Sequence, residues 1–154
     1  NKMFKKIGFL LATTLILISC DNKKIEKETL VVSNETHQHN EGDPIELNNG
    51  SKWKVVPEMM AHIRNMELDI NRFVEAKHTE LKDFRQLGAS LQKNIDLLTS
   101  NCTMDGKAHD ELHKWLLPYI EMVDKLNKSK NNDEALQTFE EIKASNKFFN
   151  IYFK

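Results

Sequence analysis

The chain has 154 residues, with 22 basic residues against 23 acidic ones and a formal net charge of −1. A chain without excess positive charge lacks the electrostatic attraction on which nucleic-acid binding depends, so we expect no nucleic-acid partner. The length is adequate for a single hydrophobic core, and we expect one folded domain.

The N-terminal residues predict export from the cytoplasm. Lys5 and Lys6 precede the apolar run IGFLLATTLILIS, which is shorter than the roughly 20 apolar residues that span a bilayer. A basic stretch followed by a short apolar run is typical of a secretory signal peptide, which we place at residues 1–19. The alternative to the lipoprotein signal described next is an ordinary signal peptide followed by an incidental cysteine.

Leu17-Ile18-Ser19-Cys20 resembles the lipobox of bacterial lipoproteins. The lipobox has four positions: an aliphatic residue, then a small or β-branched residue, then one of Gly, Ala and Ser, and finally Cys. The resemblance implies cleavage before Cys20 and lipidation of that cysteine. Removal of three lysines then leaves 19 basic residues against 23 acidic ones, a net charge near −4. The lipid, and not charge, should therefore hold the protein to its membrane.

Residues 20–50 are polar, rich in Asn, Glu and Lys, and show no sustained hydrophobic period. Such a segment cannot bury enough apolar surface to order itself, so we expect a flexible, disordered tether. A coil of about 30 residues spans roughly 30 Å on average and would hold a domain off the membrane. His37 and His39 lie in this tether and are expected to be solvated.

Residues 51–154 carry four amphipathic stripes with spacings of three and four residues, which is the period of an α-helix. The stripes predict helices over 57–77, 79–100, 106–129 and 133–150. Four matched helices with short connections favour an all-α, up-down-up-down four-helix bundle. We expect the preceding GSKWKVV stretch to dock Trp53 onto this bundle.

Several residues predict where these helices begin. Pro57 suits a first helical position, and Thr79, Asp105 and Asn132 are candidate N-caps. Pro118 lies inside the third helix, where it removes a backbone hydrogen bond and is expected to introduce a kink.

Sulfur and imidazole side chains are concentrated in the segment NCTMDGKAHDELH, which contains Cys102, Met104, His109 and His113. The expected topology brings the start of the first helix to the same end of the bundle, with His62 and Met66 on one face of it. We therefore predict a metal site formed by four ligands from this segment and completed by His62 or Met66.

Thiolate and thioether ligands with imidazole favour Cu(I), whereas zinc, the less favoured ion, rarely uses methionine. The sequence thus predicts a non-enzymatic, membrane-anchored protein that binds a soft metal as a buffer, chaperone or sensor. Each residue also has a structural interpretation, since Met is a common core filler and a lone Cys packs well when buried.

Other functions remain open at this point. HDELH has two histidines four residues apart, but the zinc-protease motif requires Glu directly after the first histidine, where this chain has Asp110. A thiol-redox role would need an intermolecular partner for Cys102, and a b-type haem between Met and His has no distinct signal. The main alternative is a helical-bundle lipoprotein that docks an envelope protein partner, with its Cys, Met and His residues serving only structure.

The pattern C-T-M-x-G-x-A-H-x-x-L-H over residues 102–113 is similar to one found in small envelope lipoproteins of Bacteroidota-type Gram-negative bacteria. The resemblance covers residues 50–153 and implies a helical fold and an envelope location, but no activity. The DNKK sequence after Cys20 lacks the acidic run that resembles a surface-export signal in such bacteria. We therefore expect lipid anchoring to a membrane, the outer membrane, with the domain facing the periplasm.

Overall fold

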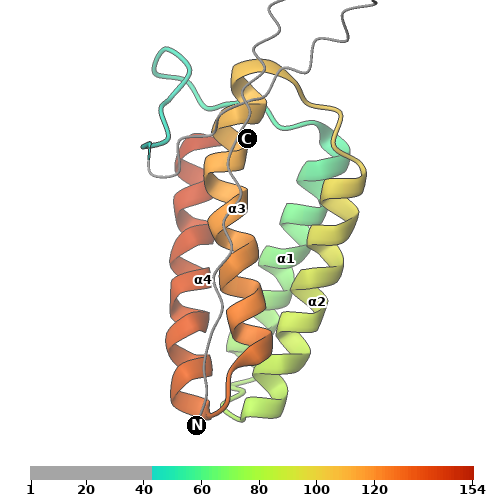
Figure 1. Ribbon diagram of the computed structural model, residues 1–154, viewed down its shortest axis with the longest axis vertical. Coiled ribbons are helices and arrows are strands. Elements are labelled where there is room, and N and C mark those ends of the chain that lie inside the picture. Colours follow the sequence, from blue (N-terminus) through green and yellow to red (C-terminus); the bar gives the residue numbers. More distant parts are fainter. Residues whose placement is uncertain (1–42) are drawn as a thin grey trace, which may run out of the picture. The chain divides into compact units, whose positions relative to one another are not determined.

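The computed structural model describes residues 43–154, which form four helices (Figure 1). They are α1 (Pro57–Glu75), α2 (Leu81–Ser100), α3 (Gly106–Lys128) and α4 (Asn132–Tyr152). Helix makes up 74% of the described residues, whose only extended pairings are isolated bridges. The all-α prediction is confirmed. The predicted signal peptide at 1–19, Cys20, and the tether up to residue 42 lie outside the described residues.

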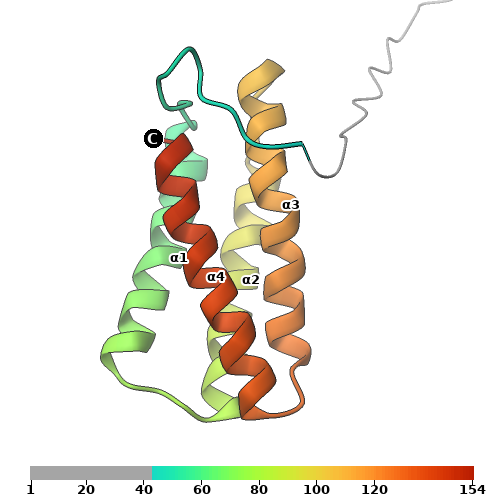
Figure 2. The same ribbon diagram turned by 90° about the vertical axis from the view of Figure 1, so that its left-hand side faces the viewer.

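Successive helices run in opposite directions, as an up-down-up-down bundle requires (Figure 1). Helix α1 packs on α2, α2 on α3 and α3 on α4, and α2 also meets α4 across the bundle. The first turns of α3 extend beyond the ends of α1 and α2, and the link 101–105 descends from them to α2 (Figures 1 and 2). This end of the bundle also holds the start of α1 and the end of α4.

The core consists of the apolar stripes that the sequence predicts. Helix α1 buries Met59, Ile63, Met66, Ile70 and Phe73, and the other three helices bury residues at the same spacings of three and four. Aromatic rings fill both ends of this core. At one end Phe73 lies 5.0 Å from Phe84 and 4.9 Å from Phe139 between ring centroids, which ties α1, α2 and α4 together.

Three of the eight predicted helix ends, at residues 57, 100 and 106, match the structure, and the other five differ by one or two residues. Thr79 is not the N-cap of α2, because the backbone is still extended at Glu80 and the helix begins at Leu81. The N-cap of α4 is Asn131 and not Asn132, since the Asn131 side chain accepts a hydrogen bond from the Glu134 N–H. Asp105 is the N-cap residue of α3, as predicted, but its side chain makes no capping hydrogen bond.

The C-terminal end of α3 is held by the neighbouring helix. Arg85 of α2 donates a hydrogen bond of 2.7 Å to the backbone carbonyl of Ser129, directly after the last turn of α3. A guanidinium at this position satisfies a terminal carbonyl and is favoured by the negative end of the helix dipole. Helix α3 continues through Pro118, which is exposed, and the kink expected there stays a prediction.

Residues 43–56 form a segment, here called the strap, that crosses from α3 to the start of α1 over the end of α4 (Figure 2). Trp53 is 8% exposed and pairs with the last residues of the chain, donating its backbone N–H to the Tyr152 carbonyl at 2.7 Å. The predicted docking of Trp53 is confirmed. Ile45 is also 8% exposed, and the Glu46 N–H is hydrogen-bonded to Glu111, so these two residues from the end of the predicted tether lie against the bundle.

Candidate functional site

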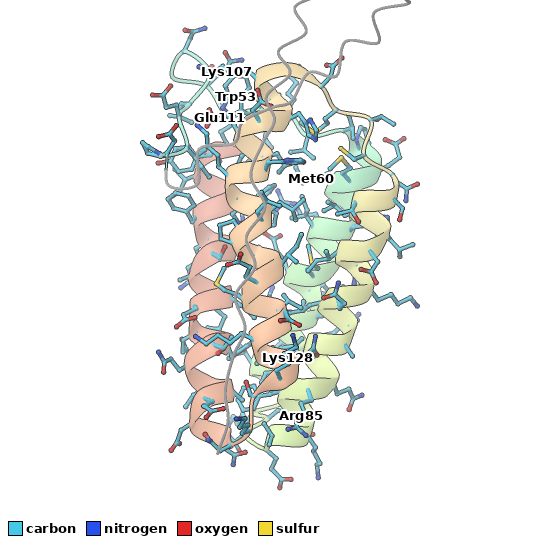
Figure 3. All side chains as sticks on the ribbon, in the orientation of Figure 1. Trp53, Met60, Arg85, Lys107, Glu111 and Lys128 are labelled. Carbon is cyan, nitrogen blue, oxygen red and sulfur yellow. The ribbon has the colours of Figure 1, made fainter. Side chains whose placement is uncertain are left out.

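Four segments meet at the end of the bundle where α3 projects: the start of α1, the link 101–105, the first turns of α3, and the strap. Figure 3 shows Met60 on α1 and Lys107 and Glu111 on α3 at this end. Because α1, α2 and α3 alternate in direction, residues about forty positions apart in the sequence lie at the same height along the bundle axis.

His109 and His113 lie together on α3. Their ring centroids are 4.1 Å apart with an interplanar angle of 68°, and both side chains are half-buried. A spacing of four residues places two side chains one above the other on a helix. Two imidazoles at this helical spacing can supply nitrogen ligands to one ion once their rings turn apart to admit it.

The flank of α3 that carries these histidines faces α2. His113 is followed at intervals of seven residues by Ile120 and Asn127, and residues seven apart share one flank of a helix. Asn127 contacts α2 directly, because a methyl group added at Gly88 would collide with its carboxamide. The imidazole pair therefore lies along the seam between α2 and α3, at the height where α2 ends.

Cys102 and Met104 come from the link that begins where α2 ends. Both are partly buried and pack against the core, and Cys102 is a free cysteine. Its backbone N–H donates to the Thr99 carbonyl at 3.4 Å, which holds the link against the last turn of α2. Met104 precedes His109 by five residues. Of the four predicted ligands of this segment, the structure brings His109 and His113 into contact, and Cys102 and Met104 lie in the adjoining link.

His62 and Met66 are placed differently from these four. Met66 is 0% exposed within the core. His62 lies on the same flank as Asp69, which accepts a hydrogen bond of 2.6 Å from Ser90 of α2. His62 therefore lies at the α1–α2 seam, on the other side of α2 from the His109–His113 pair, and its buried Nδ1 has no hydrogen-bond partner among residues 43–154.

Glu111, inside the HDELH sequence, has a structural role that the sequence analysis missed. Its carboxylate is buried, with the residue 2% exposed, and accepts hydrogen bonds of 2.8 Å from Lys114 Nζ and from the Glu46 backbone N–H. The Glu46 carbonyl in turn accepts from Trp53 Nε1 at 2.6 Å. Glu111 therefore fastens the strap to α3. The sequence feature that could have indicated the burial of Glu111 is its position beside Leu112 and Trp115 on the apolar stripe of α3.

In the part of the chain that the structure describes, no three His, Cys, Asp or Glu side chains are arranged as a ready-made metal site. Met104 is the sulfur donor nearest in sequence to the histidine pair. A metal bound here would draw on the two imidazoles, and the link 101–105 would have to bring Met104 and Cys102 to it. Among residues 43–154, no helix has the length and apolar character needed to cross a membrane.

Comparison of the chain with protein-family models, with curated proteins and with solved structures finds no match.

Proposed function

We propose that the protein binds a soft metal ion, Cu(I), at the α2–α3 seam. The observation that carries the proposal is the His109–His113 ring pair, 4.1 Å between centroids, preceded in the chain by the partly buried Cys102 and Met104 of the link 101–105. Imidazole nitrogen combined with thioether and thiolate sulfur is a ligand set that favours Cu(I) over hard divalent ions. Half-buried ligands also remain accessible to a metal delivered from solution.

The ligand set of this proposal is narrower than the one predicted from the sequence. Cys102, Met104, His109 and His113 come from one continuous segment, so binding would tie the link 101–105 to the first turns of α3. Met66 is assigned to the core, and His62 is assigned to the α1–α2 seam. In this proposal the protein acts as a metal buffer or carrier and catalyses no reaction.

A Cu(I) competition titration tests this function. Carried out in a Cys20→Ser background, where Cys102 is the only remaining thiol, it should show one ion per chain. Cys102→Ser and His109→Ala should each weaken binding by about tenfold or more, because each removes a direct ligand. Bound metal should also raise the melting temperature, since saturation at about 100 times Kd stabilises a fold by about 2.7 kcal/mol.

His78→Ala is the matched control for His109→Ala. His78 is exposed, lies in the link between α1 and α2 at the opposite end, and is 3.3 Å from the Asp83 carboxylate. Its removal should leave the Cu(I) affinity unchanged. Equal, weak affinity in all four proteins, with no rise in melting temperature on adding metal, would refute the metal function.

We further propose that the protein is anchored to the outer membrane, facing the periplasm, through a lipid on Cys20. Cys20→Ser should move the protein from the membrane fraction to the soluble fraction or stall its processing, because the mature chain has no basic excess to bind lipid headgroups. Membrane fractionation after a high-salt wash measures this. A Cys20→Ser protein that stays with the membrane would contradict the lipobox assignment.

A second candidate function, docking to an envelope protein, is favoured by apolar side chains on α4. Phe148 is 41% exposed and Ile151 is 54% exposed, and the Phe148 ring lies 4.8 Å from that of Tyr152. Exposed aromatic and aliphatic residues that lie together are typical of interaction surfaces. Failure of the Cu(I) titration would make this surface the leading candidate.

A further inference from the structure

The last two turns of α4 carry apolar side chains that are open to solvent. Phe148 is 41% exposed and Ile151 is 54% exposed, and the Tyr152 ring lies 4.8 Å from that of Phe148 between centroids. Positions 148, 151 and 152 are three and four residues apart, so their side chains adjoin on the surface of the helix. These three residues are here called the α4 patch.

The strap places two lysines beside the α4 patch. It crosses the end of α4 (Figure 2), where the Trp53 backbone N–H donates to the Tyr152 carbonyl at 2.7 Å. Because Trp53 is buried and side chains alternate along an extended chain, Lys52 and Lys54 point outward, and both are exposed. Lys52 Nζ also donates to the Asn150 carbonyl at 2.5 Å, which places its ammonium at the C-terminal end of α4.

Lys147 adds a third exposed charge, on α4 one turn before Ile151. None of the three lysines beside the α4 patch forms an ion pair with another residue among 43–154. The segments 47–56 and 143–154, which supply the patch and these lysines, contain no acidic residue. The three ammonium groups are therefore available to an anionic partner.

Carboxylates on the neighbouring segments are compensated by other groups. Glu67 of α1 is paired with Arg64 at 2.7 Å, and Glu46, earlier in the strap, lies 3.6 Å from Lys107 Nζ. Glu58 lies in the first turn of α1, where it meets the positive end of the helix dipole. The surface around the α4 patch is thus locally basic, although the chain as a whole has a net charge of −1.

Apolar side chains bordered by lysines match an anionic lipid surface better than a protein surface. Protein interfaces are enriched in Arg and depleted of Lys, and every unpaired cation around the α4 patch is a lysine. At a lipid surface, a lysine stem lies along apolar ground while its ammonium stays among the headgroup phosphates. Tyrosine, apolar with one polar end, also favours the boundary between acyl chains and headgroups.

Anchoring through Cys20 would keep this surface close to lipid. Residues 21–42 separate Cys20 from the first residue of the strap, and a chain of that length spans at most roughly 80 Å. The strap is therefore the part of the domain that lies nearest to the anchor along the chain. A surface held within such a distance of a membrane meets it at a high effective concentration.

We propose that the α4 patch, with Lys52, Lys54 and Lys147, is a docking surface for the anionic headgroup region of a membrane. The inference rests on the proposed anchoring for its setting and adds an orientation, with the strap and the end of α4 against the lipid. Phe148 and Ile151 enter the boundary of the acyl chains, and the ammonium groups contact headgroup phosphates. High salt screens this attraction, so the lipid on Cys20 remains the anchor.

Co-sedimentation with lipid vesicles tests the proposal. The chain from residue 20 to 154 carries Cys20→Ser, so that no attached lipid contributes. It is mixed at low salt with vesicles of phosphatidylglycerol and phosphatidylcholine in equal parts, or with vesicles of phosphatidylcholine alone. The protein should bind the anionic vesicles about tenfold or more tightly than the neutral ones, because each lysine near an anionic surface adds about fivefold. Added NaCl should weaken this binding.

Two matched pairs of variants assign the binding to the α4 patch. Ile151 and Leu136 both lie on α4 and are 54% and 50% exposed, but Leu136 is at the opposite end of the helix. Ile151→Ser should weaken binding to anionic vesicles by about fivefold, because its side chain leaves water on docking, and Leu136→Ser should not. Lys147 and Lys93 are both exposed, and only Lys147→Gln should weaken binding, again by about fivefold.

Three results would each overturn the proposal. The first is no binding to the anionic vesicles at low salt, which would leave the α4 patch to the envelope protein of the second candidate function. The second is equal binding to the two kinds of vesicle, and the third is equal binding by the two members of either matched pair. The assay contains neither metal nor a lipid on Cys20, so its outcome is independent of the Cu(I) titration and of the membrane fractionation.

Discussion

Replacing Phe149 by alanine is expected to lower the free energy of unfolding by about 3–5 kcal/mol, because a large buried ring is replaced by a cavity. Phe149 is 0% exposed, and its ring centroid lies 4.6 Å from that of Trp115 on α3 and 4.9 Å from that of Phe153. It therefore joins α4 to α3 at the end of the bundle where the strap is attached. Neighbouring side chains cannot fill the space, since Trp115 and Phe153 are themselves held by packing.

Phe148→Ala is the matched control, with the same chemical change one residue earlier. Phe148 is 41% exposed, so its truncation should change stability by less than about 1 kcal/mol. Urea denaturation of both variants, followed by circular dichroism, measures the difference. A Phe149→Ala protein as stable as Phe148→Ala would mean that α4 is rotated relative to the arrangement described. Phe148→Ala is also the variant with which docking through α4 can be tested in a fold that remains intact.

Glu111→Ala is expected to lower the free energy of unfolding by about 2–3 kcal/mol, because it leaves a partly buried backbone N–H and a partly buried ammonium without their acceptor. Glu111 is the residue that holds Glu46, and through Glu46 the Trp53 indole, against α3. Its loss should release the strap before the helices unfold. Hydrogen exchange at the Glu46 and Val55 amides should therefore accelerate more than exchange in the core of α2.

Glu140→Ala is a control with the same spacing and the same partner type. Glu140 pairs with Lys143 three residues later, as Glu111 pairs with Lys114, but the Glu140 side chain is 57% exposed against 3% for Glu111. The exposed pair should contribute no more than about 1 kcal/mol. Glu111→Gln keeps one acceptor oxygen for the Glu46 N–H. Its loss in the free energy of unfolding should therefore lie between the losses for Glu111→Ala and Glu140→Ala. Equal losses for Glu111→Ala and Glu140→Ala would show that the strap is held by apolar contacts alone.

The number, order and approximate bounds of the helices could be predicted from the sequence. The reason is periodicity: residues such as Met59, Ile63 and Met66 recur at helical spacing, and only one face of each helix is apolar. The exact helix ends were harder to predict from the sequence. Thr79 and Asn132 have the chemistry of N-caps, but neighbouring residues take that position, because the path of the link decides which residue is the last one outside the helix.

The candidate site was predicted in part. That His109 and His113 share one face of a helix follows from their spacing alone. The separation of His62 from them does not, because periodicity places a residue on a flank of its own helix without saying which neighbour that flank meets. Only the packing of α1 and α3 on opposite sides of α2 assigns His62 to one seam and the His109–His113 pair to the other.

The sequence by itself determined the secondary structure of this protein and the local chemistry of residues 102–113, because both depend on neighbours within a few turns of one helix. The tertiary structure decided the burial of Glu111 under the strap, and it opened the cleft between α1 and α4 that Asn146 lines. These features join residues 65 or more positions apart, as Glu46 and Glu111 are, or Glu67 and Asn150. Such contacts form only when helices have packed, since the side chains that make them carry no periodic signal of their own.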